Sequence, residues 1–227
     1  MITIKLDQEL DEEMYDDFSS LVIGGVDFGK MITRTHPSIT RDNNREYITS
    51  FYEANQAILE TNIRELQGAI DATSTEFFSS VQGIFGDDFS RNEYTGCLSI
   101  FDCNPRFVDK NLFQVFYQRD SLGKIEVTYH EVLHFAFFEY CEKHCPGVVA
   151  GMSVNGGVYW ELSELVNVII LNQPAFQSIL KRPEMLFYPS LEKTLPKIST
   201  LWDEHSKDLP RFVEKGLRML SMGNEDT

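Results

Sequence analysis

Long uninterrupted hydrophobic runs are missing from this chain of 227 residues. No stretch approaches the roughly 18 consecutive apolar residues that a membrane-spanning helix needs, so we expect no such helix. Basic charge is also scarce, because 20 Lys and Arg stand against 35 Asp and Glu, for a formal net charge of −15. A surface of that sign repels nucleic-acid phosphates and anionic membranes, so we expect neither as a partner.

Cysteine is sparse as well, since the chain has only four: Cys97, Cys103, Cys141 and Cys145. So few thiols in a chain of this length do not resemble a disulfide scaffold, and we expect them to be reduced. The segment 1–6 lacks the basic region and the apolar core of a secretory signal. These absences together predict a cytoplasmic protein.

Apolar residues, by contrast, are plentiful: they make up 42% of the chain and include 17 Phe and 9 Tyr. That content is enough to bury a full core, so we predict a single domain over residues 1–227. The expected fold class is α+β and mostly helical, with a small β-sheet that flanks a central helix. Any internal division would separate an N-terminal part with the sheet (1–120) from a helical C-terminal part (121–222).

Hydrophobic periodicity locates the expected elements. Helical spacing predicts helices over 7–22, 45–71, 74–85, 121–143 and 158–172, with further helical segments between proline breaks over 175–222. Alternation and β-rich composition predict strands over 2–6, 96–101 and 112–118. The polar segment 31–44 is typical of a loop, in which His36 would be a surface residue, and residues 223–227 are expected to be frayed.

The chain is organised around the segment 129–134, which reads YHEVLH and contains an HExxH motif. Residues four apart lie one turn apart on the same face of a helix, so His130 and His134 can direct two imidazoles at one metal ion. Glu131 lies beside them, where it can act on a metal-bound water. The neighbouring residues are apolar nearly all round, which predicts a buried helix. Because buried polar groups need partners, a zinc ion explains this set better than a solvated helix face does.

A catalytic zinc typically has three protein ligands and one open position, so a third ligand must come from elsewhere in the chain. Two glutamates of the helix expected over 158–172 compete for this role. Glu161 lies in the first turn, where the helix dipole stabilises a carboxylate without any metal. Glu164 lies in mid-helix among apolar residues, where an isolated carboxylate would be costly, and we therefore favour it. Asn167 shares its face and can support the ligand by hydrogen bonding.

An HExxH helix followed some tens of residues later by a glutamate on a second helix resembles the gluzincin branch of the zinc metallopeptidases. The resemblance implies a zincin-like fold, one Zn²⁺ per chain, and a β-strand at the edge of the cleft that holds an extended substrate; the strand over 112–118 is the candidate. Gluzincins often have a supporting aspartate four residues after the glutamate ligand, and Val168 stands there in this chain. The extended metzincin motif is absent, because Phe137 and Tyr140 replace its glycine and third histidine.

These assignments predict a small metallopeptidase that cleaves peptide bonds in a peptide or protein substrate with a zinc-activated water. Zinc lowers the pKa of its bound water toward about 7, and Glu131 would act as general base and pass the proton to the leaving amine. Tyr129, Tyr159 and His144 are candidates for stabilising the oxyanion, and the sequence selects none of them.

Two other functions stay open at this point. One is a non-catalytic zinc-binding protein with a regulatory or partner-binding role, although Glu131 would then have no purpose beside the metal. The other is a metal-free helical interaction module. Cys141, His144 and Cys145 are also close enough in sequence to form a second metal site. Their spacing matches no common structural zinc pattern, however, and buried cysteines are ordinary.

Overall fold

The computed structural model describes residues 1–223 of the chain. Most of these residues are helical, and a small mixed β-sheet accompanies them, so the predicted α+β class is confirmed. The chain forms two compact units: the first comprises residues 1–75 and 90–131, and the second comprises 76–89 and the chain from 132 onwards. The single domain expected from the sequence stays a prediction. The fraying expected over 223–227 lies outside the described residues, apart from Gly223 at the end of the last helix.

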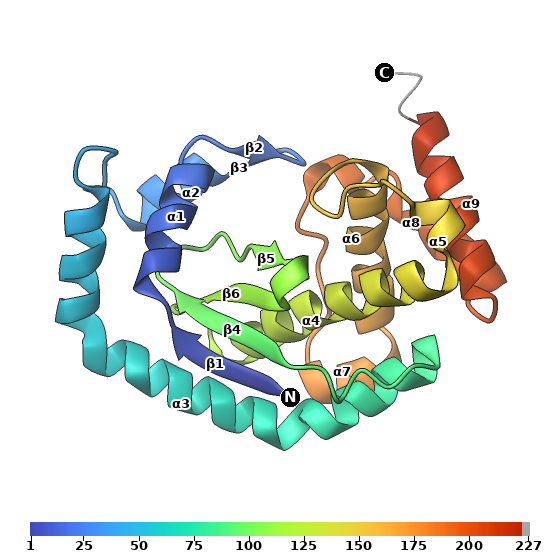
Figure 1. The fold of residues 1–227 in the computed structure, drawn as a ribbon, viewed down its shortest axis with the longest axis horizontal. Helices are drawn as coiled ribbons and strands as arrows, with labels where there is room; N and C mark the ends of the chain where they lie inside the picture. Colours follow the sequence, from blue (N-terminus) through green and yellow to red (C-terminus); the bar gives the residue numbers. More distant parts are fainter. Residues whose placement is uncertain (224–227) are drawn as a thin grey trace. The chain divides into compact units, whose positions relative to one another are not determined.

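A four-stranded sheet with the order β1-β4-β6-β5 is the framework of the first unit (Figure 1). Its parallel strands are β1 (Ile2–Leu6), β4 (Tyr94–Ser99) and β6 (Leu112–Phe116), and β5 (Arg106–Phe107) pairs with β6 in the antiparallel direction. The two central strands are almost entirely buried. Strands covered on both faces favour apolar residues at successive positions, which explains the sequence LFQVF of β6.

The strand expected over 112–118 is an inner strand of this sheet, and its proposed place beside a substrate cleft stays a prediction. β6 lies between β4 and β5, and the edge strands are β1 and β5. Residues just before β5 continue its hydrogen bonding to β6. The backbone N–H of Gln114 donates to the Pro105 carbonyl over 2.9 Å, and that of Phe116 donates to Asn104 Oδ1 over 3.0 Å. A strand of two residues is too short to produce a periodic signal, so the sequence did not reveal it.

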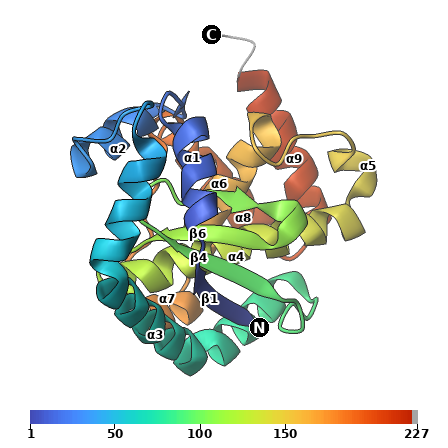
Figure 2. The same ribbon diagram turned by 60° about the vertical axis from the view of Figure 1, so that its left-hand side comes forward.

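The helices of the first unit are α1 (Gln8–Phe18), α2 (Phe28–Thr35), most of α3 (Asn44–Phe85) and the first part of α4 (Ser121–His144). A hairpin of β2 (Val22–Ile23) and β3 (Val26–Asp27) joins α1 to α2, and the 3-10 turn η1 (Val108–Lys110) joins β5 to β6. Figures 1 and 2 both show α3 running beside β1. Gln67 of α3 makes this contact, because its Oε1 accepts from the Ile4 N–H over 2.8 Å and its Nε2 donates to the Ile2 carbonyl over 3.0 Å. The open side of this edge strand is therefore partly satisfied by a side chain.

Two helices differ from the sequence prediction. The break expected between residues 71 and 74 does not occur, since α3 is continuous and the Thr73 hydroxyl bonds back to the Ala69 carbonyl over 2.8 Å inside the helix. The loop expected over 31–44 begins instead with the last part of α2, which Asp27 caps by accepting from the Lys30 N–H over 3.0 Å. Burial of Phe28 and Ile32 stabilises this short helix, a tertiary effect that local composition does not report.

The second unit is helical. It contains the last part of α3 and of α4 (Ser121–His144), followed by α5 (Pro146–Val149), α6 (Gly157–Leu171), α7 (Pro174–Leu180), the 3-10 turn η2 (Pro189–Leu191), α8 (Leu195–His205) and α9 (Leu209–Gly223). α6 is its central helix and contacts α7, α8 and α9. A Cβ on Gly216 of α9 would lie 2.9 Å from Leu162 Cδ1 of α6, so this glycine lets the two helices approach closely.

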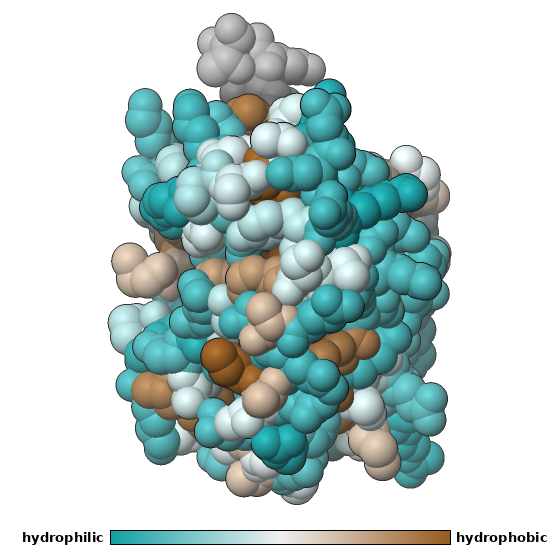
Figure 3. Space-filling model, turned by 90° about the vertical axis from the view of Figure 1, so that its left-hand side faces the viewer, coloured by the Kyte–Doolittle hydropathy of each residue, from teal (hydrophilic) through white to brown (hydrophobic). Residues whose placement is uncertain are grey.

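One face of the molecule is mainly hydrophilic. Hydrophilic residues cover most of the face drawn in Figure 3, and the hydrophobic residues there form only small separate patches. Over residues 1–223, no helix combines the length and the apolar character that crossing a membrane requires.

Candidate metal centre

The HExxH segment lies in the middle of α4, close to where the sequence places its helix. Asp120 caps this helix, because its Oδ1 accepts from the Gly123 N–H over 2.6 Å. The apolar residues after the motif are buried, and His134 is completely inaccessible to solvent. His130, one turn earlier on the same continuous helix, is half-buried. The two imidazoles therefore lie where the spacing predicts, on one face of α4.

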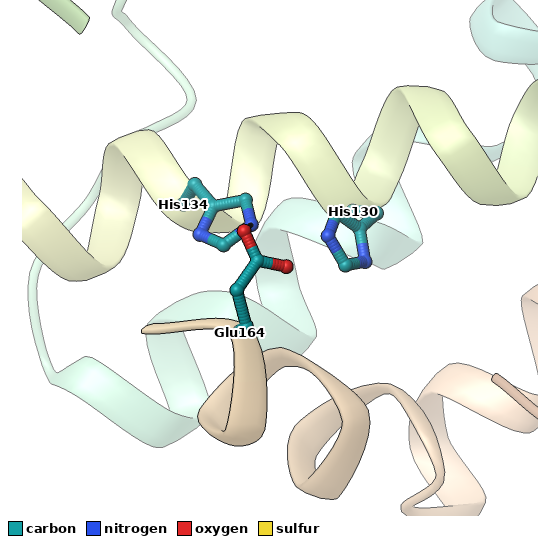
Figure 4. A group of neighbouring side chains, drawn as sticks. All are labelled: His130, His134 and Glu164. Carbon is teal, nitrogen blue, oxygen red and sulfur yellow. Dashed lines mark ion pairs between the residues drawn. The ribbon is translucent and has the colours of Figure 1, made fainter. Parts of the chain in front are cut away.

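Glu164 comes from the middle of α6, where it is buried among apolar residues. Its carboxylate points toward the two imidazoles of α4 in Figure 4. Glu164 Oε1 lies 3.4 Å from His134 Nε2, and one ligand atom from each of His130, His134 and Glu164 lies within 4.8 Å of the others. Three side chains from two helices, α4 and α6, thus converge on one point.

The donor set fits zinc. Two imidazole nitrogens and one carboxylate oxygen are the ligands of a common type of catalytic zinc site. Ligand atoms held at about 2.0–2.2 Å around a tetrahedral zinc are about 3.4 Å from one another, which is the distance between His134 Nε2 and Glu164 Oε1. The full set, within 4.8 Å, is somewhat wider than a closed tetrahedral site. These three side chains are the residues that could hold the metal.

The competing glutamate, Glu161, does not join this group. It is only partly buried, and that burial raises its pKa above the usual range for a carboxyl group. The two glutamates are three residues apart and lie on the same side of α6, nearly one turn from each other along the helix. Asn167, three residues after Glu164, is completely buried, as expected for a residue on the inner face of α6.

Glu131 is buried next to an arginine that the sequence analysis did not single out. Arg106 Nη1 of β5 lies 3.6 Å from Glu131 Oε2, and the two side chains are only 9% and 6% exposed. A guanidinium at this distance favours the ionised form of a carboxylate and holds its orientation. No local pattern indicates this pair, because Arg106 follows the turn at Asn104 and Pro105. Its approach to α4 depends on strand β5, which the sequence did not reveal.

The three residues considered for the oxyanion have other contacts. The Tyr129 hydroxyl lies 2.6 Å from Thr73 Oγ1, and burial raises the pKa of Tyr129 to about 12. Tyr159 is buried with its ring 5.0 Å from that of Phe138, and burial also raises its pKa. His144 Nε2 lies 2.7 Å from Asp87 Oδ2. These contacts explain each residue by packing or local pairing, and they select none of the three for the oxyanion.

A second metal site at Cys141, His144 and Cys145 receives no support. The part of the chain that the structure describes contains a single cluster of three or more potential ligands, the one at His130, His134 and Glu164. All four cysteines are free and buried. A hydrogen bond from Cys141 lowers the pKa of Cys145 to about 7, which is a local effect of two neighbouring thiols.

His36 is not the surface residue that its polar surroundings predicted. It is buried, with Nδ1 2.9 Å from the Tyr47 hydroxyl and Nε2 2.7 Å from the Ile100 carbonyl. The carbonyl only accepts, so Nε2 donates and Nδ1 accepts from Tyr47, which fixes a neutral tautomer. Burial accordingly lowers the pKa of His36. This histidine has a structural role in the first unit.

Comparison with known proteins adds no relative to this picture. No family model, curated protein or solved structure matches the chain, so a function has to be inferred from its own residues.

Proposed function

We propose that this chain is a zinc-dependent hydrolase, namely a small metallopeptidase of the gluzincin type with a zincin-like fold. The observation that carries the proposal is the meeting of His130, His134 and Glu164 at one point (Figure 4). A carboxylate buried in the middle of an apolar helix is costly unless it is paired or binds a metal. One Zn²⁺ per chain, held by these three residues, accounts for all of them together.

The chemistry follows from the neighbouring residues. A zinc ion bound here would supply the Lewis acid that activates a water molecule and polarises the carbonyl of a peptide or protein substrate. Glu131, adjacent to His130 in the chain, would accept the proton of that water and deliver it to the leaving amine. Arg106, 3.6 Å from Glu131, would keep this carboxylate ionised and oriented.

One observation favours a different function. The Glu131 carboxylate is buried beside Arg106, as is typical of a structural ion pair. A non-catalytic zinc-binding protein with a regulatory or partner-binding role would use the pair only to hold α4 against β5. The two functions therefore differ in whether Glu131 is needed for catalysis.

Metal content tests the site directly. We expect purified wild-type protein to contain close to one zinc per chain by elemental analysis. The Glu164→Ala variant should lose this zinc, and the Glu161→Ala variant, which removes a carboxylate from the same helix, should keep it. Loss in Glu161→Ala alone would transfer the ligand role to Glu161. Wild-type protein that contains no metal and binds no added zinc would overturn the proposal.

Activity then separates the two functions. Wild-type protein loaded with zinc should cleave members of a peptide library, and Glu131→Gln should abolish cleavage while retaining zinc. A protein that holds zinc stoichiometrically but cleaves no peptide would support the non-catalytic function. We also propose a cytoplasmic location, which the four free thiols support.

A further inference from the structure

We propose that a groove in the second unit binds an organic cation, an alkylammonium or guanidinium group carried on an apolar body. The groove has a volume of about 550 Å³. Its walls are the end of α3 at Gly83 and Ile84, the last turn of α6, and one face of α8. This volume lies in the range of about 300–1,000 Å³ that small-molecule sites occupy. The inference concerns a different part of the chain from the metal centre and does not rest on the proposed function.

The charge of the walls selects a cation. Asp203 on α8 is the only ionisable residue among those that line the groove. The groove also receives the C-terminal end of α6, where the helix dipole places a partial negative charge. No basic residue lines it to offset these two. A positively charged group is therefore the complementary occupant.

The hydrogen-bonding groups of the wall agree with this choice. The amide of Asn172 donates to the carbonyls of Val168 and Glu184, over 2.8 and 2.9 Å, and the N–H of Gln173 donates to Ile170 over 2.9 Å. Asn172 Oδ1 in turn accepts from the Glu184 N–H over 3.1 Å, and the Leu171 carbonyl accepts from the Gln177 side chain over 2.8 Å. Both amide donors of Asn172 are therefore used within the protein and are not directed at an anion, and the attraction for a cation comes from Asp203 and the helix dipole.

The remaining lining is mostly apolar, with the hydroxyl groups of Ser199 and Ser206 beside it. Trp202 lies beside Asp203 on α8, and its ring is fixed edge-on against Phe212 with the centroids 5.1 Å apart. Trp202 is only 6% exposed, so it contributes a small apolar part of the wall and no open ring face. Ile84 and Val168 add aliphatic surface on the other walls. Such a lining favours a cation attached to a hydrocarbon chain over a hydrated metal ion, for which a single carboxylate offers too few ligands.

The test compares two probes that carry this chemistry from different sources. Spermidine represents a free polyamine, and the capped peptide acetyl-Gly-Arg-Gly-amide represents a basic side chain, with acetyl-Gly-Ala-Gly-amide as the uncharged control. Binding to the whole wild-type chain is measured by isothermal titration calorimetry at low and moderate salt. Binding of spermidine alone would identify a polyamine as the occupant, and binding of the arginine peptide alone would identify a basic side chain.

Matched variants show whether binding occurs in the groove. Asp203→Asn should weaken the bound probe at least about tenfold, and Ser199→Trp, which fills the groove from α8, should abolish binding. Glu204→Gln removes the same charge from the adjacent residue of α8, which is not among those that line the groove, and should leave the affinity unchanged. Equal weakening by Asp203→Asn and Glu204→Gln would reveal unspecific attraction to an acidic chain and overturn the proposal. Failure of wild-type protein to bind either cation would overturn it as well.

Discussion

The carboxylate of Asp11 accepts hydrogen bonds from four donors that belong to separate parts of the first unit. They are the Tyr52 hydroxyl at 2.7 Å, the Ser99 hydroxyl at 2.5 Å, the Gln114 amide at 2.9 Å and the Ile100 N–H at 3.1 Å. Asp11 is completely buried on α1, so these bonds join this helix to α3, to β6 and to the end of β4. We expect Asp11→Asn to lower the free energy of unfolding by about 2–4 kcal/mol, because the amide nitrogen would face donors and leave some unsatisfied. Urea denaturation measures the loss.

The effect of Asp11→Asn should depend on pH. Burial raises the pKa of Asp11 to about 6, above the value of about 4 expected in the unfolded chain. The folded protein therefore binds this proton more tightly, and the stability that it contributes is full below pH 4 and lost as the pH rises through 6. The difference in unfolding free energy between wild type and variant should be larger at pH 4 than at pH 7. A difference that grows with pH would contradict this assignment.

Arg106 offers a second test at the scale of one side chain. If it positions Glu131, Arg106→Gln should keep the zinc but lower kcat for peptide cleavage about 10- to 100-fold, as loss of an orienting partner typically does. Arg106→Lys should restore part of the rate, because it returns the charge without the planar geometry. Zinc content and steady-state kinetics of the same preparations measure both effects. An unchanged kcat in Arg106→Gln would mean that the ion pair of Arg106 with Glu131 is structural and has no role in catalysis.

These residues differ in how much the sequence could reveal. The HExxH spacing and the apolar neighbours of Glu164 predicted a group that the structure does bring together, because both signals arise within single helices. Asp11 and Arg106 gave no such signal. Their partners come from strands and helices that are distant in sequence, and only the tertiary arrangement brings them into contact.

At the scale of whole elements, the packing of side chains on one face of the sheet depends on Gly96. A Cβ at this position of β4 would lie 2.6 Å from Ile4 Cδ1 and 2.9 Å from Phe113 Cζ, on the two neighbouring strands. The Ile4 methyl group can move, but the Phe113 ring is fully buried. We expect Gly96→Val to lower the free energy of unfolding by about 1–3 kcal/mol through overpacking.

Gly68 provides the matched control for this prediction. It lies inside α3, and a Cβ there would meet nothing within 4 Å. Gly68→Ala should therefore raise the unfolding free energy by about 0.5–1 kcal/mol, because alanine loses less conformational entropy in a helix. Thermal unfolding of both variants beside wild type measures the contrast. Stabilisation by Gly96→Val would mean that the side chains of Ile4 and Phe113 move aside without cost, which contradicts the predicted overpacking.

Elements with strong local patterns were predicted well, and those that depend on packing were not. Strand β1 and helices α4 and α6 begin and end close to the expected residues, because periodicity, caps and breakers mark them. Helix α2 and strand β5 were missed. The first is stabilised by burial of two apolar side chains, and the second exists only as a partner of β6.

At the scale of the whole molecule, removal of the metal should affect stability. A ligand that binds only the folded state adds about 2.7 kcal/mol when its concentration is 100 times the dissociation constant. We therefore expect a chelator to lower the melting temperature of the zinc-loaded wild type. The Glu164→Ala variant should melt at the same temperature with and without chelator. An equal fall in melting temperature in wild type and variant would mean that the stabilising metal is not bound at Glu164.

The strand order also determines when the sheet can form during synthesis. Ile2 of β1 pairs with Tyr94 of β4, so the first strand meets its partner only after about 90 further residues have been added. At roughly 5–20 residues per second, β1 waits about 5–20 s without a backbone partner. Parallel pairing over such a separation is also slow to nucleate, because the long loop must close first. The emerging chain is therefore open to mispairing and to chaperones until β4 and β6 have followed it.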